Sequence, residues 1–219
     1  PDQVLECRLR AAQQDGASLS GDVALVASSA PTPGGGSVVA HAGALAAALG
    51  QMVAGLTIGR KKYAAVEEEM KQLAGRASRL VVFLSSLADR DSRAYQAVSA
   101  AYKLPKEPGA AAAAREEAIT AALLGASEVP LETARACTEV TEIAEIAARR
   151  GNSNALSDAG VSALLAEAAC RGAAYNVRIN VAALPSPSAG ATMVREAQQL
   201  VARCGEMARA VTALVDAAL

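Results

Sequence analysis

The chain has 219 residues, enough to bury a core as one large domain or as two small ones. It carries 21 basic and 22 acidic residues, a net charge of −1, and only 2% aromatic residues. This balance gives no strong attraction to nucleic acid or membranes, and so few aromatic rings argue against a surface that stacks single-stranded bases. About a quarter of the residues are alanine, the best helix former, so the composition predicts a closely packed all-α protein.

The cysteines and the single histidine restrict the kinds of site that the chain can hold. Four cysteines are scattered without a C-x-x-C pair: Cys7, Cys137, Cys170 and Cys204. We therefore expect free thiols in the core and a reducing, cytoplasmic location, with no disulfide framework and no metal. One histidine excludes a His-rich zinc site and a two-histidine dyad.

Two stretches could act as an export signal or as a membrane span. The first thirty residues carry charges throughout and show no cleavable apolar segment, so we expect no secretory leader. Residues 38–58 are long and apolar enough to span a bilayer, but they consist largely of Ala and Gly and include His41 and Gln51. We interpret this stretch as a buried helix of a soluble protein.

Proline and glycine divide the chain into predicted helices. In chain order we expect helices over residues 2–14, 20–29, 37–58, 63–101 (one helix or a pair), 110–124, 130–150 and 157–184, and a last one after the turn at 185–188. Ser20 and Ser37 are predicted N-caps, and Pro130 is predicted to open a helix. No segment shows the period-two pattern of a half-buried strand. Five long helices predict an up-and-down bundle forming one domain over 1–219. Their small residues lie on more than one face, which favours a homodimer.

A proline- and glycine-rich turn leads directly into the predicted helix at 37–58. Its residues are Pro33, Gly34, Gly35, Gly36 and Ser37. The free N–H groups and positive dipole of a helix N-terminus can bind an anion there. The spacing fits neither a P-loop nor a dinucleotide fingerprint. A flexible entry loop with a serine cap is the alternative.

The order of several short motifs resembles the formimidoyltetrahydrofolate cyclodeaminase and methenyltetrahydrofolate cyclohydrolase family. The motifs are TPGGGS at 32–37, LTIGRKKY at 56–63, DRDSRAY at 89–95, LPK at 104–106, PL at 130–131, GNSN at 151–154, SD at 157–158 and NVRIN at 176–180. The resemblance covers roughly residues 25–185. It implies an all-helical dimer that binds tetrahydrofolate without metal or nucleotide and has no cofactor beyond this substrate. His41, where a small residue is expected, and Arg60, where lysine is more usual, depart from the pattern.

The resemblance implies a catalytic aspartate in the DRDSRAY element, with Asp91 as first choice and Asp89 as second. One carboxyl group can take a proton from an attacking N10 or water and deliver it to a leaving nitrogen. Residues two apart on a helix point in different directions, so one carboxylate can face a cleft while the other faces solvent. A solvated helix surface beside two arginines is the alternative.

Other polar residues are candidate substrate ligands. Arg60, Lys61 and Lys62 suit the carboxylates of a folate glutamate tail, especially a polyglutamyl one, although cations also stabilise a helix C-terminus. Tyr63 can pack on an aromatic ring of folate or on a neighbouring helix.

Asn176 and Asn180 share one helix face, where buried amides need either the pterin edge or a facing backbone as partner. The resemblance adds Asn152, Asn154 and Asp158, although Asp158 is also an ordinary residue for a helix start.

The resemblance implies a folate enzyme that cyclises 5-formimidoyltetrahydrofolate to 5,10-methenyltetrahydrofolate and releases ammonia. The alternative is a cyclohydrolase that converts 5,10-methenyltetrahydrofolate to 10-formyltetrahydrofolate, and the sequence does not separate the two. An alternative of another class is a helical interaction protein without catalysis, which the alanine-rich composition would also suit. The expected partners are tetrahydrofolate derivatives and a second copy of the chain, with no nucleic acid and no membrane.

Overall fold

The computed structural model describes residues 19–218. The helix expected at 2–14 and Cys7 lie outside the described residues. Five long α-helices account for most of the fold, and no β-strand occurs within 19–218. The elements are α2 (Leu19–Val26), α3 (Gly35–Thr57), the 3₁₀ helix η1 (Lys61–Val66), α4 (Glu67–Tyr102), α5 (Ala110–Arg150), η2 (Ser153–Ala155), α6 (Leu156–Ala182), η3 (Pro187–Gly190) and α7 (Ala191–Asp216).

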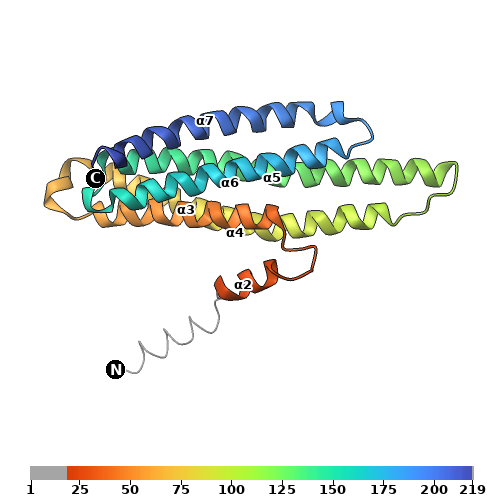
Figure 1. The fold of residues 1–219 in the computed structure, drawn as a ribbon, viewed down its shortest axis with the longest axis horizontal. Helices are drawn as coiled ribbons and strands as arrows, with labels where there is room; N and C mark the ends of the chain where they lie inside the picture. Colours follow the sequence, from red (N-terminus) through yellow and green to blue (C-terminus); the bar gives the residue numbers. More distant parts are fainter. Residues whose placement is uncertain (1–18, 219) are drawn as a thin grey trace, which may run out of the picture.

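The long helices form the predicted up-and-down bundle. Successive helices from α3 to α7 run in alternating directions, and α2 projects away from them (Figure 1). Helix α5 packs against all four other long helices, while α3 packs between α4 and α6, and α7 packs against α6. Within residues 19–218, no long helix covers the outer face of α3 and α6, although Val23 and Val26 of α2 line a pocket together with Leu45 of α3.

Small residues bring the helices of the core close together. The side chains that line the core include many alanines, for example Ala40, Ala47 and Ala54 on α3, which are fully buried. At Gly50 of α3, a Cβ atom would lie 2.9 Å from Cγ2 of Ile143 on α5. At Gly172 of α6, it would lie 2.6 Å from Cγ1 of Val39. The scarcity of aromatic residues agrees with this packing, because helices that lie so close together leave no space for large rings between them.

The three described cysteines are buried and free, as predicted. Cys137, Cys170 and Cys204 are each 0% exposed, and burial raises the pKa of the Cys137 thiol. Cys204 contacts the hydroxyl of Thr141 at 2.9 Å. These thiols are packing residues of the core.

Helix α3 is long and apolar enough, by length and composition, to cross a membrane. In this fold it lies between α4, α5 and α6, and eleven of its residues are buried. The buried residues are mainly Ala and Gly, which contact the neighbouring helices. The prediction of a core helix for this stretch is therefore confirmed.

Several predicted boundaries are wrong. Pro130 does not open a helix: it lies inside the continuous helix α5, which joins the segments expected at 110–124 and 130–150. Residues 61–66 form a 3₁₀ turn before α4, which begins at Glu67 rather than at residue 63. The helix expected at 20–29 spans Leu19–Val26. The 41 residues of α5 tolerate an internal proline because tertiary packing along the helix outweighs the local penalty.

Ser37 is not a helix cap. Helix α3 begins at Gly35, its N-cap residue is Gly34, and no side chain of the N-cap forms a capping hydrogen bond. The Ser37 hydroxyl is directed away from its own helix end, toward α4. The sequence pattern does not reveal this, because the group that accepts a hydrogen bond at the start of α3 is the carboxylate of Asp91 on another helix.

The close packing of α3 on α5 can be tested with two glycine substitutions. Gly50→Ala should destabilise the protein by about 1–3 kcal/mol, because the added methyl group overpacks against Ile143. Gly75→Ala in α4 is the matched control, since its Cβ would meet only the flexible end of Arg79 at 3.8 Å. The control should gain up to about 1 kcal/mol from helix propensity. Urea unfolding of both variants measures the difference, and equal effects would contradict the packing argument.

Candidate active site

The first turn of α3 meets the C-terminal half of α4 at Asp91. The hydroxyl of Ser37 donates to Oδ2 of Asp91 at 3.0 Å, and the backbone N–H of Ser37 also donates to this carboxylate. Ser37 Oγ additionally lies 3.1 Å from the carbonyl of Ala88 and 3.3 Å from Oγ of Ser92. Asp91 thereby takes the place of an N-cap side chain for α3, although it belongs to another helix.

Gly36 makes this arrangement possible. A Cβ atom at Gly36 would overlap the carboxylate of Asp91, so any side chain there would displace it. Gly35, by contrast, has open space where its Cβ would be, and it is exposed. Gly34 and Pro33 precede them in a half-buried turn. The predicted glycine turn therefore lies next to the predicted catalytic aspartate, 54 residues further along the chain.

The environment of Asp91 changes its acidity. Burial raises the pKa of the Asp91 carboxyl group, and the side-chain and backbone hydrogen bonds from Ser37 oppose this rise. Desolvation is the larger influence, so the carboxylate is more basic than an exposed aspartate. A carboxyl group of raised pKa beside an open turn is suited to accept and return a proton.

Asp89 lies on a different face of α4 from Asp91 and is exposed. The difference agrees with the expectation that only one of the two carboxylates faces a cleft. The structure thus favours Asp91 over Asp89 for a catalytic role, and that role stays a prediction.

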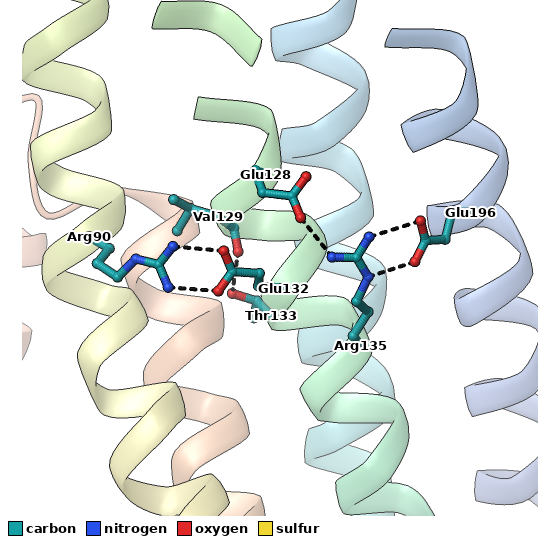
Figure 2. Close-up of polar contacts among 7 residues, drawn as sticks. All are labelled: Arg90, Glu128, Val129, Glu132, Thr133, Arg135 and Glu196. Carbon is teal, nitrogen blue, oxygen red and sulfur yellow. Dashed lines mark hydrogen bonds and ion pairs between the residues drawn. The ribbon is translucent and has the colours of Figure 1, made fainter. Parts of the chain in front are cut away.

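An ion pair between α4 and α5 lies directly beside Asp91. Arg90 forms two hydrogen bonds with Glu132, at 2.6 and 2.7 Å (Figure 2). The pair is partly buried, with 38% and 21% of the two side chains exposed. Because Arg90 and Asp91 are adjacent on the helix, fixing Arg90 against α5 also limits how far α4 can rotate away from α3. The sequence pattern does not reveal this pair, because Arg90 and Glu132 lie 42 residues apart on different helices.

The two asparagines of α6 reach the same end of the bundle. Ser162 of α6 donates to the carbonyl of Ala46, and Gly172 packs on Val39, so α6 runs antiparallel to α3. Asn176, one turn after Gly172, therefore lies level with the first turn of α3. Its side-chain nitrogen donates to the carbonyl of Gly172 at 3.0 Å. Asn180 donates to the carbonyl of Ala126 on α5 at 2.7 Å.

The basic residues form a second group at the opposite end of α3. Arg60, Lys61 and Lys62 follow Thr57, so they lie about 30 Å from Gly36 by the rise of the helix. Arg60 donates through Nε to the carbonyl of Leu56 at 2.7 Å, which caps α3. Lys61 and Lys62 are exposed. The predicted residues are thus brought together as two clusters and not as one.

Tyr63 joins the basic residues to the loop before α6. Its hydroxyl lies 3.1 Å from Oγ of Ser153 and accepts a hydrogen bond from the Ser153 N–H at 2.9 Å. These two bonds, with a smaller effect of Lys62, lower the pKa of Tyr63 to about 8. Lys62 lies 5.2 Å from the centre of the Tyr63 ring and 3.5 Å from Ser153 Oγ. Ser153 lies inside the GNSN motif, but its contact with Tyr63 joins residues 90 apart and is not visible in the sequence pattern.

Asn152 is buried and its amide closes the end of α3. Its side-chain nitrogen donates to the carbonyl of Leu56 at 3.1 Å, and its backbone N–H donates to Thr57 Oγ1 at 2.8 Å. Its side-chain oxygen accepts from the N–H of Asn154, which is exposed. Asp158 lies half-buried in the first turn of α6. A structural role explains Asn152 fully, whereas Lys61 and Asn154 are exposed and Asp158 is half-buried.

Comparison with known proteins identifies the family. A family model described as formiminotransferase-cyclodeaminase matches residues 18–215. The chain belongs to the formiminotransferase-cyclodeaminase family. It is 44% identical to the methenyltetrahydrofolate cyclohydrolase of Methylorubrum extorquens, over 83% of this chain and 88% of that protein.

Two further relatives carry the other activity in their names. The formimidoyltransferase-cyclodeaminase of Mus musculus is 37% identical over 75% of this chain, which spans only 30% of the mouse protein. The crystal structure of the formiminotetrahydrofolate cyclodeaminase of Thermotoga maritima matches with a TM-score of 0.83 and 30% identity, covering 91% of this chain and 96% of that one. The all-α fold and the family resemblance are thereby confirmed, and a non-catalytic role is not favoured.

Because the pKa of Asp91 is raised, its ionised carboxylate should lower the stability of the folded protein although the reaction needs it. Because the folded state holds its proton more tightly than the unfolded state, the Asp91 term stabilises the protein fully only at low pH and is lost as pH rises through the raised pKa. Asp91→Asn removes a desolvated charge, so it should unfold at an equal or higher temperature than the parent at pH 7 to 8. It should lose about 10²- to 10⁴-fold in turnover, the usual contribution of a proton-transfer group.

Asp89→Asn provides the matched control on the same helix, because its carboxylate is exposed. Thermal melts from pH 4 to 8 and steady-state kinetics measure both effects. Full turnover in Asp91→Asn, or a large loss in Asp89→Asn alone, would contradict the assignment of Asp91.

Proposed function

We propose that this protein acts on the one-carbon unit that bridges N5 and N10 of tetrahydrofolate, as a 5,10-methenyltetrahydrofolate cyclohydrolase. The observation that carries the proposal is the Asp91 carboxylate, half-buried against the glycine turn at the start of α3. The relative that is named for this activity is 44% identical and is covered over 88% of its length, which favours this activity over its alternative.

The proposed chemistry uses Asp91 as a base and then as an acid. Water attacks the bridging carbon of the methenyl cation while the carboxylate accepts one of its protons. The negative charge of Asp91 also stabilises the positively charged substrate. The proton then passes to N5 as the C–N5 bond breaks, and the hydroxyl proton of the intermediate goes to solvent. The products are 10-formyltetrahydrofolate and one proton.

The second candidate is cyclodeamination of 5-formimidoyltetrahydrofolate, which the similarity to the Thermotoga maritima cyclodeaminase supports. Here N10 attacks the carbon of the protonated imine. Asp91 would take the N10 proton and deliver it to the amino nitrogen, which leaves as ammonia with the bonding electrons. Methenyltetrahydrofolate remains. The same carboxylate serves both reactions because the same carbon is attacked in each.

An absorbance assay of methenyltetrahydrofolate separates the two activities. The cyclohydrolase should speed the loss of added methenyl compound above its spontaneous rate, and Asp91→Asn should not. A cyclodeaminase should instead form methenyl compound from the formimidoyl substrate and release ammonia. If neither reaction exceeds the rate of a heat-inactivated sample, the proposed function is wrong.

We further propose that two copies of the chain build each site. The Asp91 and Lys61 clusters lie about 30 Å apart along α3, which exceeds the reach of a monoglutamyl folate. Between them, the outer face of α3 exposes Val38, Leu45 and Met52, which are spaced by seven residues and are 41, 50 and 41% exposed.

The neighbouring face of α6 continues this apolar surface. Val161, Leu164, Tyr175 and Ile179 are between 46 and 66% exposed. An apolar face of this kind marks an interaction surface. If a second copy packs its α3 antiparallel on this face about a two-fold axis, the basic cluster of each chain comes to lie beside the Asp91 of the other.

Mixed dimers test the shared site. Asp91→Asn and the double variant Lys61→Ala, Lys62→Ala should each be impaired, the latter more for a polyglutamyl substrate if these lysines bind the tail. Mixing the two after mild unfolding and refolding should restore roughly one site in four, because random pairing makes half of the dimers hybrid and each hybrid carries one intact site. Recovery no greater than the sum of the parents would show that each site is built within one chain.

A further inference from the structure

A carbonyl group of α5 lacks its normal partner within the helix. In an α-helix the carbonyl of residue 126 accepts from the N–H of residue 130, but Pro130 has no N–H. Ala126 and Pro130 are both buried, so water is a poor substitute for the missing donor. The side-chain nitrogen of Asn180 donates to this carbonyl at 2.7 Å. An amide from α6 thus replaces the hydrogen bond that the proline removes.

This bond also links two helices. Asn180 lies near the C-terminus of α6, where the helix ends at Ala182. Near the middle of α6, Cys170 Sγ contacts the carbonyl of Ala134 at 3.7 Å, a weaker interaction. The Asn180 bond to Ala126 is therefore a strong polar tie between α5 and α6 at the end where the glycine turn lies.

The tie lies one turn from Asn176. Asn176 and Asn180 are four residues apart on α6, so they share a face and move together with the helix. Asn176 uses its nitrogen on the nearby carbonyl of Gly172, and it lies level with the first turn of α3. A shift of α6 along α5 would displace Asn176 relative to Gly36 and Asp91. The end of α6 is thus where a fixed register matters for the candidate site.

We propose that Asn180 is a positioning residue, which holds α6 in register through the carbonyl that Pro130 leaves free and so places Asn176 at the substrate. The proposal rests on the proposed function, since it assumes that substrate binds at the Asp91 cluster. It changes the role expected for Asn180, whose nitrogen is engaged by the backbone of α5. Of the two asparagines, Asn176 is the one that contacts substrate.

A single and a double variant test this role. Asn180→Ala leaves the Ala126 carbonyl unpaired and releases α6, so it should lower the melting temperature and raise KM for methenyltetrahydrofolate about tenfold, the effect of one weakened hydrogen bond. Adding Pro130→Ala to it supplies a new N–H for the Ala126 carbonyl. The double variant should regain most of the lost melting temperature, yet its KM should stay raised because α5 and α6 are still not tied.

Two results would overturn the proposal. If the double variant regains the parent KM together with its melting temperature, the bond only satisfies a carbonyl and positions nothing. If Asn180→Ala lowers turnover without lowering the melting temperature, Asn180 contacts substrate directly. Should Asn180→Ala fail to fold, the double variant, in which the carbonyl is paired, still gives the decisive KM.

The parent protein and Asn176→Ala are the controls. Asn176→Ala should raise KM without lowering the melting temperature, and an unchanged KM in this variant would remove the reason for holding α6 in register. If the parent itself shows no activity on either substrate, the proposed function fails separately. The bond between Asn180 and the Ala126 carbonyl can then still be tested by amide hydrogen exchange at the end of α6. Exchange should be faster in Asn180→Ala and in the double variant, and unchanged exchange would contradict a role of this bond in holding α6.

Discussion

The carboxylate of Asp91 occupies the space that a side chain at position 36 would fill, and much of the candidate site depends on this contact. It requires glycine at the start of α3, it replaces the missing N-cap of that helix, and it keeps the carboxylate away from bulk water. The two hydrogen bonds from Ser37 favour the ionised form, while burial favours the protonated form. This opposition gives a carboxyl group that can both accept and return a proton.

The same constraint explains the composition of the bundle. A carboxylate from α4 reaches the first turn of α3 only if the two helix axes lie close together, and small residues such as Gly43 and Ala47 permit this approach. At Gly43 a Cβ atom would lie 3.2 Å from Cδ2 of Leu84 on α4. Ala and Gly in the core therefore serve the site as well as helix formation. Small side chains cannot set the relative positions of the helices by shape alone. The polar contacts Arg90–Glu132 and Asn180–Ala126 hold α4 and α6 in place against α5.

Helix content and the order of the long helices could be predicted from the sequence, because proline and glycine mark most of the ends. Pro130 misled this prediction, since the donor that makes an internal proline tolerable, Asn180, comes 50 residues later. The pairing of Gly36 with Asp91 is likewise invisible to spacing, because it depends on the antiparallel packing of α3 and α4. The site residues came from ordered motifs, and those motifs do not reveal that the Asp91 and Lys61 clusters lie at opposite ends of α3. The cytoplasmic location and the expected absence of metal, other cofactors, nucleic acid and membrane partners stay predictions.

The separation of the two clusters has a physical consequence for the enzyme. A helix of 23 residues is rigid, so no loop motion within one chain can bring Lys61 to Asp91. Either the cationic cluster binds only a long, flexible anionic tail that extends out of the site, or the cationic cluster beside each Asp91 comes from a second chain. The apolar face of α3, exposed along the whole distance between the clusters, favours the second arrangement. In that arrangement the folded monomer alone would hold the acid–base group without the cations that orient its substrate, so dimerisation and catalysis would share one interface.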